Sequence, residues 1–267
     1  MDTKPTVLIP IAPGTNRNDE LALAFRAAGA ATNQVPLAQL RNGEVKLVDH
    51  QILALPGGFS YGDALGAGRL LGLDLNSWFA EQLREARGRH MPIIGICNGF
   101  QALVKAGLLP GTTEPSGSSV RKADPVVATL TENQKGRFEC RWVELIPGAT
   151  WSPWMSGLDG PVRCPVAHGE GRFVASDLAA LDAADRIAFR YGIGDGAGRQ
   201  AGGSYPENPN GSADDVAGIV DETGLVLGLM PHPEDHVFDR QDPLRRRGRS
   251  GGCLALFEAG VRTVIQS

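Results

Sequence analysis

Short apolar runs alternate with helix-like stretches in the first part of the chain, and this alternation limits the fold more than any other feature. Three runs have the length of buried strands: Thr6–Ile11, Ile52–Leu55 and Ile93–Ile96. Residues 19–28 and 99–106 have helical spacing, and residues 63–87 are predicted to be largely helical, with glycines that can break the helix. Strands that alternate with helices favour a parallel sheet with helices on both faces. We therefore predict an α/β fold with a doubly wound, mostly parallel sheet.

The middle of the chain has a different pattern. Four strand-like segments follow one another without long helices between them: residues 126–130, 139–146, 172–175 and 187–191. They predict an antiparallel extension of the same domain. Residues 216–220 and 225–229 predict a hairpin, residues 254–264 a final helix, and the glycine-rich residues 192–203 a mobile loop. Because we find neither an internal repeat nor a linker, we expect residues 1–267 to form a single domain.

The composition excludes several classes of partner. The formal net charge is −4 and the pI about 5.8, so the chain lacks the basic footprint of a nucleic-acid-binding protein. Its basic run, Arg245–Arg247 with Arg249, is flanked by glycines and is interpreted as a solvated loop rather than a phosphate or partner contact. No apolar stretch is long enough to span a bilayer, and the first residues lack a secretory apolar region. We expect a cytoplasmic protein that binds neither membrane nor nucleic acid.

The sequence gives no sign of a metal or cofactor. The four cysteines, Cys97, Cys140, Cys164 and Cys253, form no C-x-x-C pair, so we predict neither a zinc site nor a thioredoxin-type motif. In a reducing compartment they are expected to be free thiols. The chain also has no G-x-x-x-x-G-K-[ST] sequence, and therefore no nucleotide site of the Walker type is predicted.

Cys97 lies at the junction of a predicted strand and a predicted helix. The sequence Gly95-Ile96-Cys97-Asn98-Gly99 has the spacing of a nucleophile elbow, in which flanking glycines allow a sharp turn and expose the nucleophile above the sheet. A thiol at a helix N-terminus is also favoured as thiolate. A lone cysteine is more often a buried core residue, but the glycines on both sides favour a nucleophile.

His232 is the best candidate for the base that a thiol nucleophile needs. It follows the apolar run 225–229, at a strand end where parallel-sheet proteins place their ligands. Glu234, two residues on, can accept a hydrogen bond from one ring nitrogen and leave the other for Cys97. The alternative is a surface histidine in a proline-rich loop. His168, within His-Gly-Glu-Gly, is the serious rival.

The remaining histidines are weaker candidates. His50 and His90 each precede a strand and are expected to be exposed, and His236 follows in a polar stretch. On the opposite side of the predicted site, Gly58 or its neighbour can present backbone N–H groups to a developing oxyanion, together with the N–H of Asn98. Glycine pairs also mark ordinary turns, so this feature alone is weak.

Six motifs, taken together, resemble the class I glutamine amidotransferases, and specifically the glutaminase subunits of phosphoribosylformylglycinamidine synthase. They occur in the family's order and span most of the chain. The elbow and the His-Pro-Glu motif are shared by the class, whereas Gly-Gly-Phe-Ser-Tyr-Gly-Asp, His-Gly-Glu-Gly and Asn-Pro-Asn-Gly-Ser point to this subunit. The motifs lie at residues 57–63, 95–101, 106–111, 167–172, 208–212 and 230–234.

The resemblance implies a flavodoxin-like amidotransferase fold, with Cys97 as nucleophile, His232 as base and Glu234 as its orienter. Contacts to glutamine or to the oxyanion are then predicted from six further residues: Gly57, Gly58, Phe59, Asn98, Gln101 and His168. Ammonia from glutamine would pass to a synthetase subunit that uses ATP to convert formylglycinamide ribonucleotide to the amidine. A small third subunit often joins such complexes.

The chain departs from the family pattern at several places. Asp235 occupies a position where arginine often follows the glutamate, and Arg17 a position where a cysteine often lies. The chain also has extra residues around 194–206 and 236–252. Three other functions remain open: a glutaminase of another pathway, such as guanylate or carbamoyl phosphate synthesis, a different cysteine hydrolase on a similar fold, or a non-catalytic scaffold for a synthetase.

Overall fold

The computed structural model describes residues 4–111, 127–243 and 252–265. A nine-stranded sheet runs through the molecule in the order β2-β1-β3-β4-β11-β10-β9-β6-β7, and β5 and β8 form a separate two-stranded sheet. The strands of the large sheet are β1 (Thr6–Ile11), β2 (Ala31–Pro36), β3 (Ile52–Leu55), β4 (Ile93–Ile96), β6 (Glu139–Pro147), β7 (Val162–His168), β9 (Ile187–Gly192), β10 (Val216–Val220) and β11 (Val226–Leu229). The small sheet pairs β5 (Ala128–Thr131) with β8 (Arg172–Ala175).

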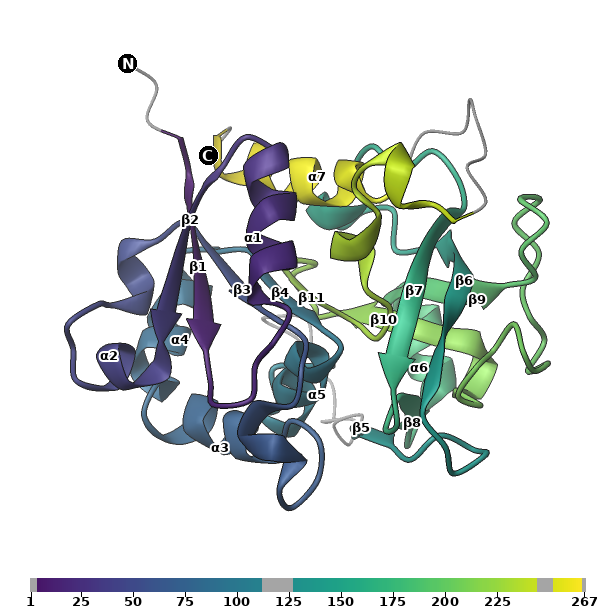
Figure 1. The fold of residues 1–267 in the computed structure, drawn as a ribbon, viewed down its shortest axis with the longest axis horizontal. Coiled ribbons are helices and arrows are strands. Elements are labelled where there is room, and N and C mark those ends of the chain that lie inside the picture. Colours follow the sequence, from purple (N-terminus) through teal and green to yellow (C-terminus); the bar gives the residue numbers. More distant parts are fainter. Residues whose placement is uncertain (1–3, 112–126, 244–251, 266–267) are drawn as a thin grey trace, which may run out of the picture.

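The first half of the large sheet is parallel, from β2 through β1, β3 and β4 to β11. Strands β3, β4 and β11 are buried along their whole length, because helices cover both faces (Figure 1). The helices among the described residues are α1 (Asn18–Ala27), α2 (Leu37–Arg41), α3 (Arg69–Ser77), α4 (Ala80–Gly88), α5 (Asn98–Lys105), α6 (Leu178–Ala183) and α7 (Leu254–Ile265). On one face α1 packs on α7 through an edge-to-face contact of Phe25 and Phe257, while α3 and α5 pack together on the other.

The second half of the sheet is antiparallel. Strand β10 pairs with β11 and β9, and β6 pairs with β9 and β7. Strand β7 is therefore an edge strand, and its outer backbone groups are free to bind other segments. This arrangement confirms the predicted α/β class with a mostly parallel sheet, an antiparallel extension and the hairpin formed by β10 and β11.

Several predicted elements differ from the observed ones. Residues 63–87 are largely helical, as predicted, but the first helix, α3, begins only after Gly66 and Gly68, which adopt positive φ, and the break before α4 falls at Trp78 and Phe79 rather than at a glycine. Strands β2 and β7 were not predicted. Strands β5 and β8 were predicted as part of the antiparallel extension, but they pair with each other in a separate sheet. Residues 192–203 contain turns and a bridge between Gly192 and Gln200, so their mobility stays a prediction.

Two further predictions concern the basic run and membrane spans. The basic run at residues 245–249 lies outside the described residues. None of the helices in the described part of the chain is long and apolar enough to cross a membrane.

Candidate active site

Cys97 stands at the sharp turn between β4 and α5. Its φ of 51° and ψ of −106° place it in a backbone region that few side chains adopt, and it caps the N-terminus of α5. The flanking glycines make the turn possible: a Cβ on Gly95 would lie 2.7 Å from the carbonyl carbon of Gly99, and one on Gly99 would lie 2.2 Å from the Leu55 oxygen. The sequence therefore folds here as the spacing of the elbow predicted.

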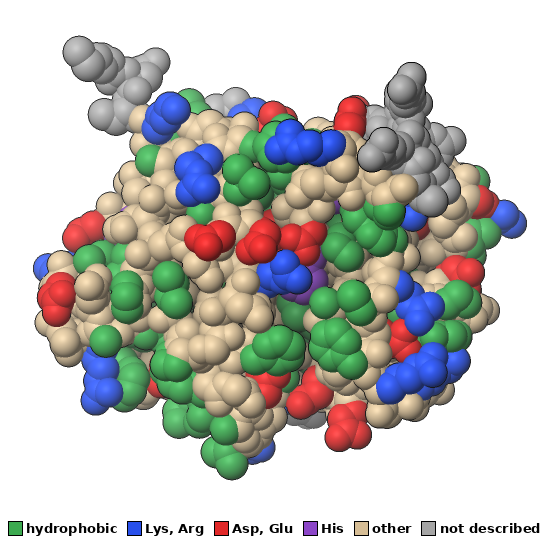
Figure 2. Space-filling model, in the orientation of Figure 1, with side chains coloured by type: hydrophobic (Ala, Val, Ile, Leu, Met, Phe, Trp, Pro, Cys, Tyr) green, Lys and Arg blue, Asp and Glu red, His purple; other side chains and the backbone are tan. Residues whose placement is uncertain are grey.

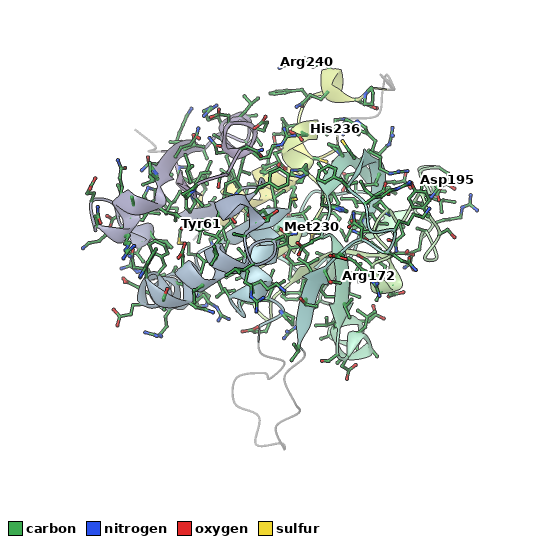
Figure 3. The ribbon with its side chains drawn as sticks, turned by 60° about the horizontal axis from the view of Figure 1, so that its bottom comes forward. Tyr61, Arg172, Asp195, Met230, His236 and Arg240 are labelled. Atoms are coloured by element: carbon green, nitrogen blue, oxygen red, sulfur yellow. The ribbon has the colours of Figure 1, made fainter. Side chains whose placement is uncertain are left out.

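His232 reaches the same edge of the sheet from the neighbouring strand. Strand β11 runs parallel to β4, with Leu229 opposite Ile96, so both chains leave the sheet side by side. Figure 3 shows Met230, which follows β11, near the centre of the molecule. The backbone N–H of His232 then donates to the Pro165 oxygen over 2.8 Å, which fixes the segment against the free edge of β7.

The imidazole of His232 is held between Glu234 and Cys97. Its Nδ1 lies 2.7 Å from Glu234 Oε1, and its buried Nε2 has no hydrogen-bond partner among the described residues. Burial alone would lower the pKa of His232, but the carboxylate of Glu234 and the negative charge of Cys97 outweigh it, so this pKa lies well above its usual value. The site is closely packed, since a Cβ on Gly57 would lie 2.7 Å from His232 Cε1 and 3.4 Å from Cys97 Cβ.

His168 lies beside this group but has a different environment. Its Nδ1 is 3.1 Å from Asn133 Oδ1 and its Nε2 is 3.4 Å from Asn210 Nδ2, so both ring nitrogens face polar partners. Burial, together with the charge of His232, lowers the pKa of His168 to about 4. The ring is therefore neutral near pH 7, and its nitrogens are already engaged, which favours His232 as the base.

The turn at residues 57–59 adjoins both Cys97 and His232, and α5 begins directly after Cys97. The Phe59 N–H already donates to Gly14 O, and the Phe59 side chain points to solvent with 43% exposure, so Gly58 remains as the possible oxyanion donor of this turn. Gly58 has a φ of 126°, which a residue with a Cβ rarely adopts. Asn98 is the first residue of α5, and its N–H therefore lacks a partner within the helix.

The side chains of Asn98 and Gln101 organise the loops around the site. Asn98 accepts from the Ser60 N–H over 3.2 Å and donates to Gln101 Oε1 over 3.0 Å. Gln101 in turn donates to the backbone carbonyl oxygen of Glu170 over 2.7 Å, and the side-chain carboxylate of Glu170 accepts from the Ala67 N–H over 3.3 Å. These bonds join the loop after β3 to the loop after β7 across the site.

Sequence reasoning missed several residues that support the site. Asn133 accepts from the Gly171 N–H, and Asn210 donates to the Tyr191 hydroxyl and to Gly171 O. The Asn-Pro-Asn-Gly-Ser motif was a signal for Asn210, whereas isolated polar residues such as Asn133 gave none. His50 was expected to be exposed and His236 to lie in a polar stretch, but both are buried. There, His50 contacts Lys46 O and Asn33, and His236 Nδ1 contacts Arg163 O.

Arg17 and Asp235, which depart from the family pattern, lie close together in the structure. Arg17, in the loop before α1, pairs with Asp235 over 3.8 Å and with Glu20 over 3.2 Å. Figure 2 shows acidic and basic side chains next to one another near the middle of this face, where a histidine is visible. Burial and the nearby Glu234 raise the pKa of Asp235 to about 6, and Arg17 opposes that rise. Among the described residues no group of His, Cys, Asp or Glu is arranged to hold a metal ion.

Comparisons with known proteins agree with this geometry. A family model described as CobB/CobQ-like glutamine amidotransferase domain matches residues 4–264. The chain is 45% identical to the phosphoribosylformylglycinamidine synthase subunit PurQ of Treponema denticola, over 98% of this chain and 100% of that protein. It is 41% identical to the PurQ subunit of Dehalococcoides mccartyi, over 90% and 89% of the two chains.

Among solved structures, a chain of the PurLQS structure from Thermotoga maritima matches with a TM-score of 0.71 and 30% identity, covering 98% of this chain and 99% of that one. The fold, the site and the family model define a glutamine amidotransferase domain of class I. Within that class, the chain belongs to the PurQ family of phosphoribosylformylglycinamidine synthase subunits.

Proposed function

We propose that this chain hydrolyses glutamine to glutamate and ammonia and supplies the ammonia to a partner synthetase. That synthetase makes formylglycinamidine ribonucleotide from formylglycinamide ribonucleotide and ATP in purine biosynthesis. One observation carries the proposal: Cys97 stands at a strained elbow directly opposite the His232–Glu234 pair. The PurQ relatives, whose names place them in this synthase, support the choice of pathway.

The chemistry follows from the three side chains. The Cys97 thiolate attacks the side-chain amide carbon of glutamine, and the carbonyl oxygen becomes an oxyanion. His232, held as a charged ring by Glu234, donates its proton to the leaving nitrogen, and the C–N bond breaks to release ammonia and a glutamyl thioester. The neutral ring then takes a proton from water, which attacks the thioester, and the departing Cys97 sulfur restores the resting state as glutamate leaves.

The oxyanion needs donors that are already in place. Gly58 follows Gly57, which abuts both His232 and Cys97, and Asn98 follows Cys97 directly, so we assign this role to the backbone N–H groups of Gly58 and Asn98. Removing one such donor typically costs about a hundred- to a thousandfold in rate. Gln101, His168 and the exposed Phe59 are proposed to contact or enclose the substrate, since Gln101 lies one helical turn after Cys97 and the buried His168 is close enough to His232 to feel its charge.

The assembly and the location are part of the same proposal. We propose that residues 1–267 act as one domain, without a cofactor, and bind a synthetase subunit and a small third subunit in the cytoplasm. The matched structure from Thermotoga maritima is described as PurLQS, which supports the partners. The continuity of one large sheet through both halves of the chain supports the single domain.

The experiment that tests this function separates ammonia formation from ammonia use. In the complex reconstituted with its synthetase, Cys97→Ser should abolish glutamine-dependent formation of formylglycinamidine ribonucleotide, while high external ammonium at alkaline pH restores it. The fold should survive, since the change alters little volume. Cys140→Ser, at an exposed cysteine, is the matched control and should keep glutamine-dependent activity.

Two outcomes would contradict parts of the proposal. If ammonium does not rescue an assembled Cys97→Ser complex, Cys97 does something besides glutamine hydrolysis. If a guanylate-forming complex is rescued and the purine-amidine complex is not, the pathway is wrong although the glutaminase chemistry stands.

A further inference from the structure

A second cysteine–histidine group lies on the same strand edge as the active site. Alternate carbonyls of β7 point outward from the sheet: Ala167 O is 3.8 Å from Cys97 Sγ, and Pro165 O accepts the His232 N–H. Two residues further along, Arg163 O accepts from both His236 Nδ1 and Cys253 Sγ, the latter over 3.4 Å. Cys253 and His236 therefore converge on one backbone oxygen, outside the machinery proposed for glutamine.

Cys164 completes this group. It follows Arg163 on β7 and is buried, and Cys253 Sγ lies 3.4 Å from the carbonyl oxygen of that same Arg163. His236 Nδ1 is bound to the Arg163 carbonyl, and its buried Nε2 has no hydrogen-bond partner among the described residues. Two thiols and one imidazole are thus enclosed together, at the point where the turn before α7 packs on the sheet edge.

The two thiols differ in their acidity. The neighbouring Cys164 thiol, assisted by His236 and opposed by burial, lowers the pKa of Cys253 to about 7. Burial and the neighbouring Cys253 raise the pKa of Cys164. Cys253 is therefore the more acidic thiol of the two, which suits it to the attacking role and Cys164 to the resolving role.

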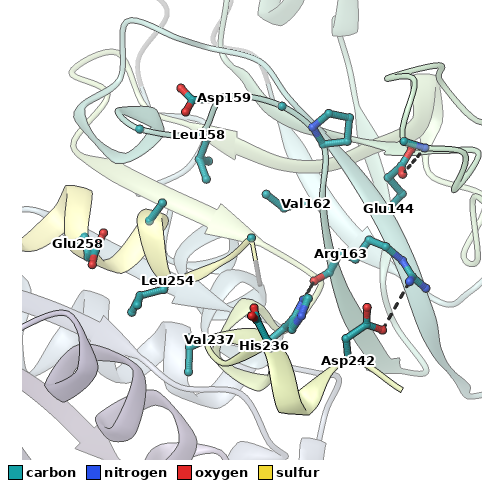
Figure 4. A pocket seen from close by; sticks show the side chains of 17 residues that line it. Glu144, Leu158, Asp159, Val162, Arg163, His236, Val237, Asp242, Leu254 and Glu258 are labelled. Carbon is teal, nitrogen blue, oxygen red and sulfur yellow. Dashed lines mark hydrogen bonds and ion pairs between the residues drawn. The ribbon is translucent and has the colours of Figure 1, made fainter. Parts of the chain in front are cut away.

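A cavity borders this group, and the residues on either side of Cys253 line it, although neither thiol does. It has a volume of about 650 Å³, and its wall includes Val162, Arg163, His236, Gly252 and Leu254, the neighbours of both thiols. Figure 4 shows His236 and Arg163 on one side of it, joined by their hydrogen bond. A water-sized oxidant needs only a small part of this space.

We propose that Cys253 and Cys164 form a thiol modification site that a hydroperoxide oxidises to a reversible disulfide. The Cys253 thiolate attacks one peroxide oxygen, the O–O bond breaks, and the leaving hydroxide takes a proton and departs as water. The Cys164 sulfur then attacks the sulfur of the resulting sulfenic acid. The S–O bond breaks and the oxygen leaves as a second water with the Cys164 proton, so two thiols lose two electrons to one hydrogen peroxide.

The disulfide joins β7 to the start of α7, two elements far apart in sequence. An S–S bond of about 2.05 Å is shorter than the contact between two thiols, so the strand edge and the turn must draw together. The same edge positions His232 and Cys97. A change in glutaminase activity on oxidation is expected for this reason, and that consequence rests on the proposed function, whereas the disulfide itself does not.

The test uses the full chain with Cys97→Ser and Cys140→Ser, which leaves only Cys164 and Cys253 as thiols. The folded protein is treated with hydrogen peroxide, free thiols are alkylated, and peptides are mapped without reduction. We expect a cross-linked Cys164–Cys253 peptide and a Tm raised by several degrees, because the bond closes a long loop of the unfolded chain. Dithiothreitol should reverse both changes.

Variants separate the two roles. Adding Cys164→Ala should leave a sulfenic acid on Cys253 that a cyclic dione traps, whereas adding Cys253→Ala should leave Cys164 unreactive. If either variant fails to fold, the peptide map of the two-cysteine protein still decides, because the cross-link forms there or it does not. Thiols that stay fully alkylatable after peroxide treatment, or a Cys253 that goes to sulfinic acid without a cross-link, would overturn the proposal.

Discussion

Gly57 sets the space in which His232 and Cys97 face each other. Its φ is ordinary, so alanine fits the backbone there, but the added Cβ would lie 2.7 Å from His232 Cε1. We therefore expect Gly57→Ala to displace the ring and lower kcat for glutamine hydrolysis by about a hundredfold, as a misplacement of about 1 Å typically does. Gly88→Ala is the control, because a Cβ there meets no atom within 4 Å.

The measurement for this pair is the kinetics of glutamine hydrolysis together with the Tm of each variant. Gly57→Ala should keep a Tm close to that of the parent while its activity falls, and Gly88→Ala should change neither. Equal activities of the two variants would mean that His232 is not held where the close packing places it.

The roles of His232 and Glu234 are separable by kinetics. His232→Asn should lower kcat/KM by about a hundred- to ten-thousandfold, because the thiolate loses its partner and the leaving ammonia its proton donor. Glu234→Gln should cost less, since only the orientation and the charge are lost. The carboxylate raises the pKa of His232, so in Glu234→Gln the alkaline limb of the kcat/KM profile should move to lower pH. His90→Asn, at an exposed histidine, serves as the control.

The lowered pKa of the buried His168 predicts how the stability of the fold changes with pH. Its pKa is about 4 in the folded protein and near 6.5 when unfolded, so it contributes no pH dependence above pH 6.5. As the pH falls from 6.5 towards 4, the unfolded chain binds a proton that the folded chain does not, and the free energy of unfolding decreases. The loss should reach about 2 kcal/mol between pH 7 and pH 5.

Urea unfolding at pH 7 and pH 5 tests this effect. Comparing the parent protein with His168→Gln cancels the contributions of other groups, among them Asp235, whose raised pKa acts in the opposite direction. The variant should lose less stability on acidification than the parent. Two parallel stability curves would show that His168 is not held neutral by its surroundings.

At the scale of elements, the buried parallel strands were the easiest to predict. Strands β1, β3 and β4 begin and end where the sequence placed them, because each is a short apolar run closed by proline, glycine or the elbow. Strand β2 was not predicted because it is a polar edge strand, Ala-Thr-Asn-Gln-Val-Pro. Only one of its residues is buried, so it lacks the apolar run by which a buried strand is recognised. The predicted helical stretch over residues 63–87 begins only after Gly66 and Gly68, whose positive φ no periodicity reveals, and it divides at Trp78 and Phe79, where no glycine marks the break.

Strand β7 shows why part of the site could not be predicted. Arg163, Pro165 and Ala167 alternate with buried residues, and a proline inside such a run weakens the strand signal, although an edge strand tolerates it. The motifs nevertheless located Cys97, His232 and Glu234, which the fold brings together. What the sequence could not give is the set of long-range hydrogen bonds, such as those of Asn133, that depend on the packing of distant loops.

At the scale of the whole molecule, the site is closed. Cys97 and His232 are 5% and 2% exposed, and Glu170 ties the loops after β3 and β7 together through Ala67 and Gln101. We therefore expect glutamine to reach the thiol when these loops separate. The loops lie at the carboxyl ends of the parallel strands, so a partner docked there can shift the balance between closed and open arrangements.

We therefore expect the isolated chain to be a poor glutaminase. Adding the synthetase, with formylglycinamide ribonucleotide and ATP, should raise kcat for glutamine hydrolysis at least about tenfold, a change of only about 1.4 kcal/mol in the barrier. Glu170→Gln removes the charge that holds Ala67 and should raise the activity of the isolated chain while reducing its dependence on the synthetase. If the isolated parent chain already works at the full rate of the complex, the loops open without a partner, and the bonds of Glu170 do not restrain the site.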